Sequence, residues 1–208
     1  MRSRKRARGD GSRQERPPGA TIGGEAAHRG GQYAGLWPRS LAFAVDYLVI
    51  AAWLALVTAA GAVVNRVAPT ITATLFSRPL SGQVAAFLLV TLPVTLYFAL
   101  LEASPWQASW GKRKLHLRVT TVGGTRLSRA RALTRTALKF VPWELAHTCV
   151  WQIARVPDQA PSSAVLAGLA LVGALVAANV ASPLADRRRR ALDDRLAGTV
   201  VVYAHVTS

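Results

Sequence analysis

The sequence predicts an all-α membrane protein with four transmembrane helices and a small β-element on the cytoplasmic side. About half of its 208 residues are hydrophobic, and they gather into runs long enough to cross a bilayer. The formal net charge of +16 sits in blocks between these runs instead of being spread over a whole surface. Long apolar runs separated by basic blocks are typical of a multi-pass protein whose basic loops stay in the cytoplasm.

The chain begins with a basic tail, residues 1–34, that contains many Arg and Gly residues and cannot build a core. We expect this tail to be disordered and cytoplasmic, ahead of a membrane domain at residues 35–206. Basic tails can bind nucleic-acid phosphates, but a positive flank beside anionic lipid accounts for this one. We therefore expect anionic lipid at the cytoplasmic face of the bilayer, and no nucleic acid, as a partner.

Three runs have the length of about 17–25 mostly apolar residues that a spanning helix needs. They are residues 41–64, 84–101 and 164–184. The first contains Asp46 as its only ionisable group, and the second contains Pro93, which lipid-embedded helices tolerate. A fourth run at residues 137–153 is shorter and more polar, so hydropathy alone does not decide whether it spans.

The placement of Lys and Arg indicates whether residues 137–153 span the membrane. The tail, residues 102–136 and residues 185–195 are rich in these residues, whereas residues 65–83 and 154–163 carry few. Because cytoplasmic loops accumulate Lys and Arg, these segments alternate between inside and outside only if the fourth run also crosses. We predict four spans, with the N- and C-termini in the cytoplasm.

The basic cytoplasmic loop has a β-pattern of its own. Leu115, Leu117 and Val119 alternate with polar residues, and Gly123-Gly124 follows as a turn. This pattern predicts a β-hairpin. The β-branched segment at residues 198–206 lies on the same side of the membrane and is expected to add a third strand.

Polar side chains within or beside the spans concentrate in the cytoplasmic half of the membrane. They are Arg39, Asp46, Glu102, Glu144, His147 and Asp194. A bare carboxylate at the depth of Asp46 is strongly disfavoured, so it must be neutral, paired or hydrated. Arg39 lies seven residues earlier, close to two helical turns, and points the same way. We expect Arg39, Asp46 and Asp194 to form one cluster at the mouth of a vestibule open to the cytoplasm.

Two readings of these residues stay open. The Arg39–Asp46 pair fits an ion-handling role and a purely structural role equally well.

Glu144 and His147 have the Glu-x-x-His spacing of di-iron bundles, but a metal site needs more ligands than one such pair supplies. We expect no metal. The sequence contains no Ser-His-Asp, metalloprotease or nucleotide-binding motif, so we expect neither an enzyme nor a cofactor.

Three segments, in order, resemble the RDD family of bacterial membrane proteins, which is named for one arginine and two aspartates. They are "YAGLWPRSLAFAVD", "SPWQASWGKRKLHLRV" and "RALDDRLAGTVVV". The resemblance places the family's arginine at Arg39 and its aspartates at Asp46 and Asp194. Asp193 stands where the family often has His. The resemblance implies a small transporter in a bacterial cell membrane.

Two functions therefore remain. One is a small transporter of a cation, a proton or a small solute, with Asp46 as the titratable carrier and Arg39 tuning it. Four short helices enclose little volume, so such a transporter would work as a homo-oligomer. The alternative is a non-transporting scaffold or regulatory module. It would recruit a partner or anionic lipid through the basic loop, with Lys112, Arg113 and Lys114 facing the partner.

Overall fold

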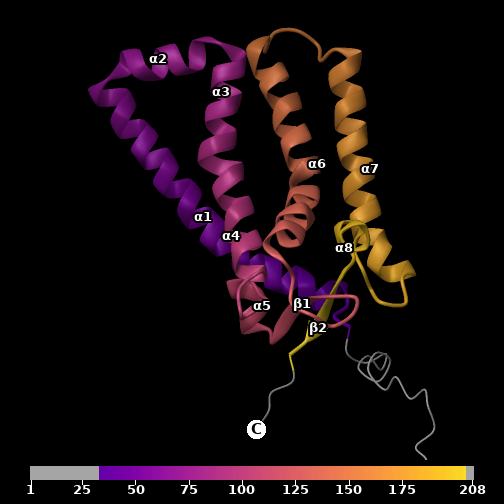
Figure 1. Ribbon diagram of the computed structural model, residues 1–208. Helices are drawn as coiled ribbons and strands as arrows, with labels where there is room; N and C mark the ends of the chain where they lie inside the picture. Colours follow the sequence, from indigo (N-terminus) through magenta and orange to yellow (C-terminus); the bar gives the residue numbers. More distant parts are fainter. Residues whose placement is uncertain (1–32, 205–208) are drawn as a thin grey trace, which may run out of the picture.

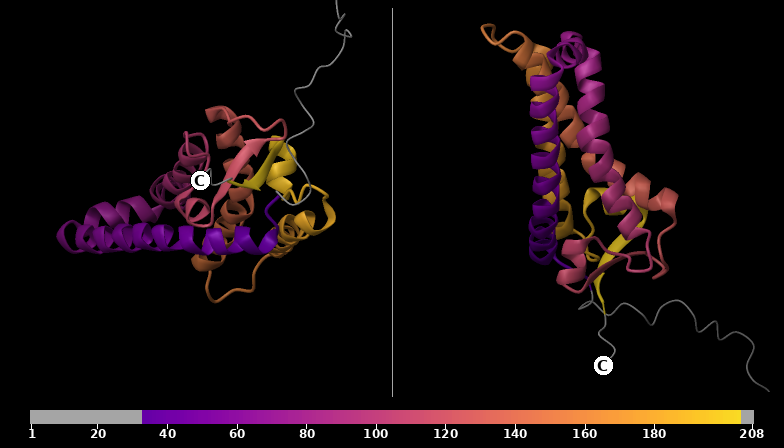
Figure 2. Two further views of the ribbon diagram at one scale, coloured as in Figure 1. Left: turned by 90° about the horizontal axis from the view of Figure 1, so that it is seen from below. Right: turned by 90° about the vertical axis from the view of Figure 1, so that its left-hand side faces the viewer.

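The computed structural model describes residues 33–204, which form a bundle of long helices with a small sheet at one end (Figure 1). The first half comprises α1 (Leu36–Val67), α2 (Pro69–Ser77), α3 (Pro79–Ala86), the π-helical η1 (Phe87–Thr91), α4 (Leu92–Glu102), α5 (Trp110–Lys114) and β1 (Leu117–Thr121). The second half comprises α6 (Arg129–Arg155), α7 (Ser163–Ala185), α8 (Leu192–Ala197) and β2 (Thr199–Tyr203). The short elements α5, α8, β1 and β2 gather at one end of the bundle, here called the sheet end, with α2 at the other (Figures 1 and 2).

Among residues 33–204, three helical stretches are long and apolar enough to cross a membrane. They are Leu36–Val67, Leu80–Glu102 and Ser163–Ala185. Each contains one of the spans predicted at residues 41–64, 84–101 and 164–184 and extends it at both ends. The expected fourth span, residues 137–153, lies inside the 27-residue helix α6, which runs alongside α7 but is not apolar enough to be counted with the other three (Figure 1). The predicted count of four is therefore not confirmed.

The second span changes its helical winding just before Pro93. Proline has no backbone N–H, so the carbonyl of Leu89, four residues earlier, lacks its α-helical donor. The Trp53 indole N–H of α1 donates to this carbonyl at 2.8 Å. A lipid-embedded helix tolerates proline when a neighbouring helix supplies the missing donor in this way. The contact also joins α1 to the second span.

The sheet corrects the predicted hairpin. β1 pairs antiparallel with the C-terminal strand β2, from Leu117 opposite Tyr203 to Thr121 opposite Thr199. The chain does turn at Gly124, which has a φ of 81°, but only four residues separate this turn from α6, too few for a returning strand. β2 supplies the partner instead, because its apolar segment Val200–Val202 is buried. Tyr33 adds an isolated antiparallel bridge to Val202 in place of a third strand.

The buried core is concentrated at the sheet end. One cluster joins the start of α1, the sheet and the start of α6 through Ala34, Ala42, Leu117, Val119 and Val201, among others. By contrast, the apolar window of α7 has none of its residues buried within the described chain. The helices thus present apolar side chains outward, as a membrane requires. Of the expected disordered tail, residues 1–32 lie outside the described residues, while Tyr33 and Ala34 belong to the folded core.

Candidate functional site

A chain of alternating charges crosses the sheet end, and we call it the ion network. Arg39 Nη1 of α1 lies 2.5 Å from Asp194 Oδ2 of α8, and Asp194 Oδ1 lies 2.7 Å from Arg135 Nη2 of α6. Arg135 Nη1 is 2.6 Å from Glu102 Oε2 at the end of α4, and Glu102 Oε1 is 2.8 Å from Lys112 Nζ of α5. Both carboxylates have no exposed side-chain surface. The ion network therefore ties five helices together where the chain is most polar.

The two adjacent acids of α8 differ in their electrostatics. Burial raises the pKa of Asp194, but Arg135 and Arg39 outweigh it and hold that pKa well below its usual range. Asp194 also accepts hydrogen bonds from the Thr199 hydroxyl at 3.1 Å and the Ala191 backbone N–H at 3.2 Å. Burial raises the pKa of Asp193, and Arg135, whose Nη2 is 3.6 Å from its Oδ2, only partly opposes this. Asp194 is thus the acid that carries a fixed charge in the ion network.

Asp46 is fully buried and is held by neutral donors. It accepts hydrogen bonds from the Tyr97 hydroxyl at 2.9 Å, the Ser109 hydroxyl at 2.5 Å and the Gly111 backbone N–H at 2.7 Å. These contacts fasten the start of α5 against α1. A Cβ at position 111 would lie 2.0 Å from the carbonyl oxygen of Ala42, so only glycine permits this approach. Asp46 is an anchor for the loop between α4 and α5.

The expected Arg39–Asp46 contact does not form, since no ion pair joins these two side chains within residues 33–204. Helical side chains lean toward the helix N-terminus, so Arg39 extends toward α8, away from Asp46. The two Cα atoms lie about 10 Å apart along the helix at 1.5 Å per residue. The cluster predicted for the pair with Asp194 therefore contains Arg39 and Asp194, with Asp46 in a neighbouring set of hydrogen bonds.

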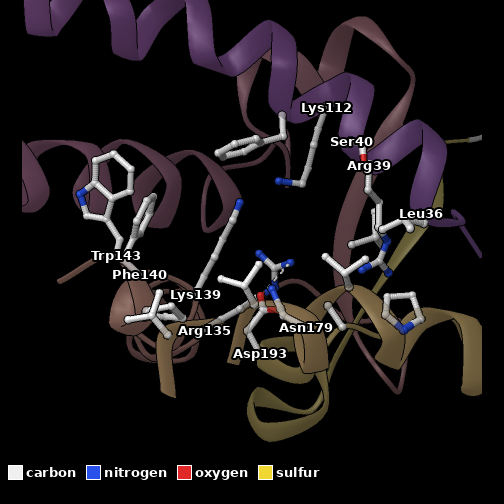
Figure 3. Close-up of a pocket in the computed structure, with 18 of the residues that line it drawn as sticks. Leu36, Arg39, Ser40, Lys112, Arg135, Lys139, Phe140, Trp143, Asn179 and Asp193 are labelled. Atoms are coloured by element: carbon white, nitrogen blue, oxygen red, sulfur yellow. Dashed lines mark ion pairs between the residues drawn. The ribbon is translucent and has the colours of Figure 1, made fainter. Parts of the chain in front are cut away.

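A cavity of about 490 Å³ lies beside the ion network, between α1, α6 and α7 (Figure 3). Its polar lining comprises Arg39, Ser40, Lys112, Arg135, Lys139, Asn179 and Asp193. Its apolar lining includes Phe43, Phe140, Trp143, Ala146, Val172, Val176 and Val180. Lys112 and Lys139 reach into the cavity from different helices, with Trp143 and Phe140 to one side and Arg39 to the other (Figure 3). The volume is typical of a small-molecule site.

Comparison with known proteins decides the family. Residues 33–198 match the family model of the RDD family, which covers most of the chain. This chain belongs to the RDD family. No curated protein and no solved structure matches it. Together with its apolar helices, the RDD match makes the chain a membrane protein.

The sequence motifs place the family's arginine at Arg39 and its two aspartates at Asp46 and Asp194. In this RDD protein, these three residues make two connections between helices. Arg39 and Asp194 connect α1 to α8. Asp46 connects α1 to α5 through the backbone of Gly111. All three lie at the sheet end and position elements that border the cavity.

Glu144 and His147 lie apart from the ion network. The Thr91 hydroxyl donates to Glu144 Oε1, and His147 Nδ1 is 3.7 Å from the same oxygen. Glu144 is nine residues beyond Arg135 on α6, about 14 Å along the helix. Both side chains are partly exposed. Within the described part of the chain, no three His, Cys, Asp or Glu side chains come together as a metal site would need.

The three basic residues that were expected to face lipid or a partner divide into two groups. Lys112 is buried in the ion network, because one turn of α5 points it at Glu102. Arg113 and Lys114 are exposed, with their charged groups 4.2 Å and 5.6 Å from the ring centroids of Trp106 and Trp110. The burial of Lys112 contradicts the prediction for that residue, and the roles expected for Arg113 and Lys114 stay predictions.

Sequence reasoning missed Arg135 and did not single out Lys139. Arg135 was counted only as one of many basic residues of the cytoplasmic loop. Yet it lies three residues after Ala132 and one before Thr136, both buried, so it belongs to the inward face of α6. A positive charge within that inward face, in a chain with three acids elsewhere that need partners, could have identified Arg135 as an ion-pair residue.

Proposed function

We propose that this RDD protein is a small transporter that binds its solute in the cavity between α1, α6 and α7. The observation that carries the proposal is the state of Lys139, which lines the cavity without an ion-pair partner among residues 33–204. Its Nζ lies over aromatic rings instead, 4.5 Å from the Phe98 centroid and 4.6 Å from the Phe43 centroid. A lysine held by rings and facing a cavity is ready to pair with an incoming anion.

The cavity also favours one kind of solute. Four basic side chains line it, Arg39, Lys112, Arg135 and Lys139, against Asp193 as the acid in its lining. Such a lining repels small cations and attracts anions. Asp46, the carrier expected for a proton or a cation, is fully buried and does not line the cavity. Of the solutes that the sequence left open, an anionic small solute fits best.

The proposal includes four crossings, with α6 as the third. In Figure 1 the α6–α7 connection lies at the same end as α2, opposite the sheet end. The basic segments at residues 102–136 and 185–195 lie at the sheet end, so the positive-inside rule places that end in the cytoplasm. Arg135 and Lys139 are among the charged residues that lower the hydropathy of α6, and they face the ion network and the cavity. A bacterial cell membrane is the expected location.

Transport by the reconstituted full-length chain tests the proposal. Vesicles would be loaded and challenged separately with small organic anions, Na⁺ and a proton gradient. We expect anion uptake that falls about tenfold in Lys139→Gln, because hydrogen bonds to charged groups contribute about 1.5–3 kcal/mol. Arg131→Gln is the matched control, since it removes an exposed positive charge from the same helix. Uptake of Na⁺ or protons without anion uptake would overturn the assignment of the solute.

A second candidate rests on the exposed face of α5. Arg113 over Trp106 and Lys114 over Trp110 combine cations with aromatic rings, a combination suited to the bilayer interface. This surface supports a scaffold that docks on anionic lipid or a partner. If the protein is only a scaffold, replacing Arg113 and Lys114 by Gln abolishes binding to anionic vesicles, and Lys139→Gln changes no measured activity.

A further inference from the structure

We infer that the cavity binds an anionic amphiphile with a single alkyl chain, its headgroup at Lys139 and its chain beside the apolar part of α6 and α7. The inference rests on the cavity of the proposed function and deepens it by naming the ligand class. Its test measures binding, which does not require transport.

The lining of the cavity changes from charged to apolar along α6. Arg135 and Lys139 are followed, on the same face, by Trp143 and Ala146. Arg135 and Ala146 are eleven residues apart, about 16 Å along the helix. A free inorganic anion would use only the charged part of a site this long. A molecule with a charged head and an apolar body uses both parts.

The facing helix continues the apolar part. Val172, Val176 and Val180 recur at intervals of four residues, so they form one stripe of α7 toward the cavity. Trp143 and Phe140 of α6 belong to the same lining. With a volume of about 490 Å³ the cavity is of the size that holds one small molecule, so we assign it one chain.

Among residues 33–204, the charges around the headgroup position leave one positive charge without an ion-pair partner. The basic residues are Arg39, Lys112, Arg135 and Lys139, and the acids of the ion network and its edge are Glu102, Asp193 and Asp194. Every basic residue except Lys139 is within 4 Å of one of these acids. Lys112 Nζ lies 5.5 Å from the centroid of the same Phe98 ring that Lys139 approaches. Two ammonium groups that share one ring repel each other, and an anion between them removes the repulsion.

Arg39 provides an independent sign of a missing acceptor. Its Nη2 is buried and has no hydrogen-bond partner among residues 33–204, although its Nη1 and Nε are both bonded. A buried unpaired donor is costly. Arg39 lines the cavity, so the carboxylate or phosphate headgroup of a bound ligand could supply an acceptor for this donor.

Quenching of Trp143 fluorescence by a bromine-bearing ligand tests the inference. The full-length chain would be placed in neutral-lipid nanodiscs and titrated with dodecanoate brominated along its chain. We expect saturable quenching that disappears in Trp143→Phe, and a Kd at least tenfold higher in Lys139→Gln. Arg131→Gln, which loses an exposed charge on the same helix, should leave the Kd unchanged. Dodecyl phosphate should compete with the probe, whereas butyrate and inorganic phosphate should compete poorly.

Two results would overturn the inference. If brominated dodecanol quenches Trp143 as well as the carboxylate does, the headgroup charge has no role. If quenching does not saturate, or is the same in Lys139→Gln, the probe reports bulk lipid and not a site. Anion transport without amphiphile binding would leave the proposed function standing and reject only this inference. Saturable binding without transport would leave this inference standing and reject the proposed function.

Discussion

Replacing Arg39 by Gln and Asp194 by Asn, singly and together, tests the ion network most directly. Asp194 is fully buried and the Arg39 side chain is 12% exposed, so solvent screens their 2.5 Å contact little. Arg39→Gln leaves Asp194 with both of its Arg135 bonds, and we expect a loss of about 2 kcal/mol, the value of one charged hydrogen bond. Asp194→Asn leaves two guanidinium groups short of a carboxylate and should cost about 3–5 kcal/mol. The coupling between the two changes should be about 1–2 kcal/mol.

A second cycle, with Arg39→Gln and Asp46→Asn, serves as the comparison. Arg39 and Asp46 share no bonding partner among the described residues, so their effects should add within about 0.5 kcal/mol. The free energy of unfolding would be measured for each variant by circular dichroism in a denaturant titration of the detergent-solubilised protein. A coupling above about 1 kcal/mol between Arg39 and Asp46, or none between Arg39 and Asp194, would refute the pairing described here.

Four shorter predictions follow. Gly111→Ala should destabilise the protein by about 3 kcal/mol or more, because the new Cβ overlaps a backbone carbonyl and pushes the Gly111 N–H from its carboxylate; urea or thermal unfolding would show it. Because the pKa of Asp194 is lower in the folded protein than in the unfolded chain, its stabilisation is complete above about pH 4 and is lost as the pH falls below that value, so the midpoint of thermal unfolding should drop only in acid. Trp53→Phe leaves the Leu89 carbonyl without its indole donor and should cost about 1 kcal/mol in unfolding free energy, with helicity unchanged. A reporter fused after Asp158 should behave as exported, and a cytoplasmic phenotype there would show that α6 does not cross.

The sequence was sufficient for features that depend on local composition. Three spans were located because an apolar run of that length has few alternatives in water or in lipid. The proximity of Arg39 to Asp194 followed from their nearness to the same end of two different spans. Such statements need only the distance along the chain to a membrane boundary.

The rest depended on packing between distant segments. β1 had two candidate partners, and burial of Val200–Val202 chose the distant one. Asp46 had an arginine on its own helix, but three other donors bond to it instead. They are the Tyr97 hydroxyl of α4 and, at the start of α5, the Ser109 hydroxyl and the Gly111 backbone N–H. Helical periodicity shows which face a side chain is on, but not which loop folds against that face. The cavity could not be predicted for the same reason, since side chains of five separate helices line it.

The positions of these residues separate folding from binding in an unusual way. The helices α1, α8 and α5 are connected through Arg39, Asp194 and Asp46. A change to any of these residues therefore alters both the walls of the cavity and the stability of the protein. Loss of activity in such variants would not distinguish a solute contact from a misplaced helix. Lys139 differs, because no carboxylate depends on it for an ion pair within residues 33–204 and its charge repels the neighbouring cations. Its replacement by Gln should leave the fold intact, which makes Lys139 the position where a change in binding can be attributed to the ligand itself.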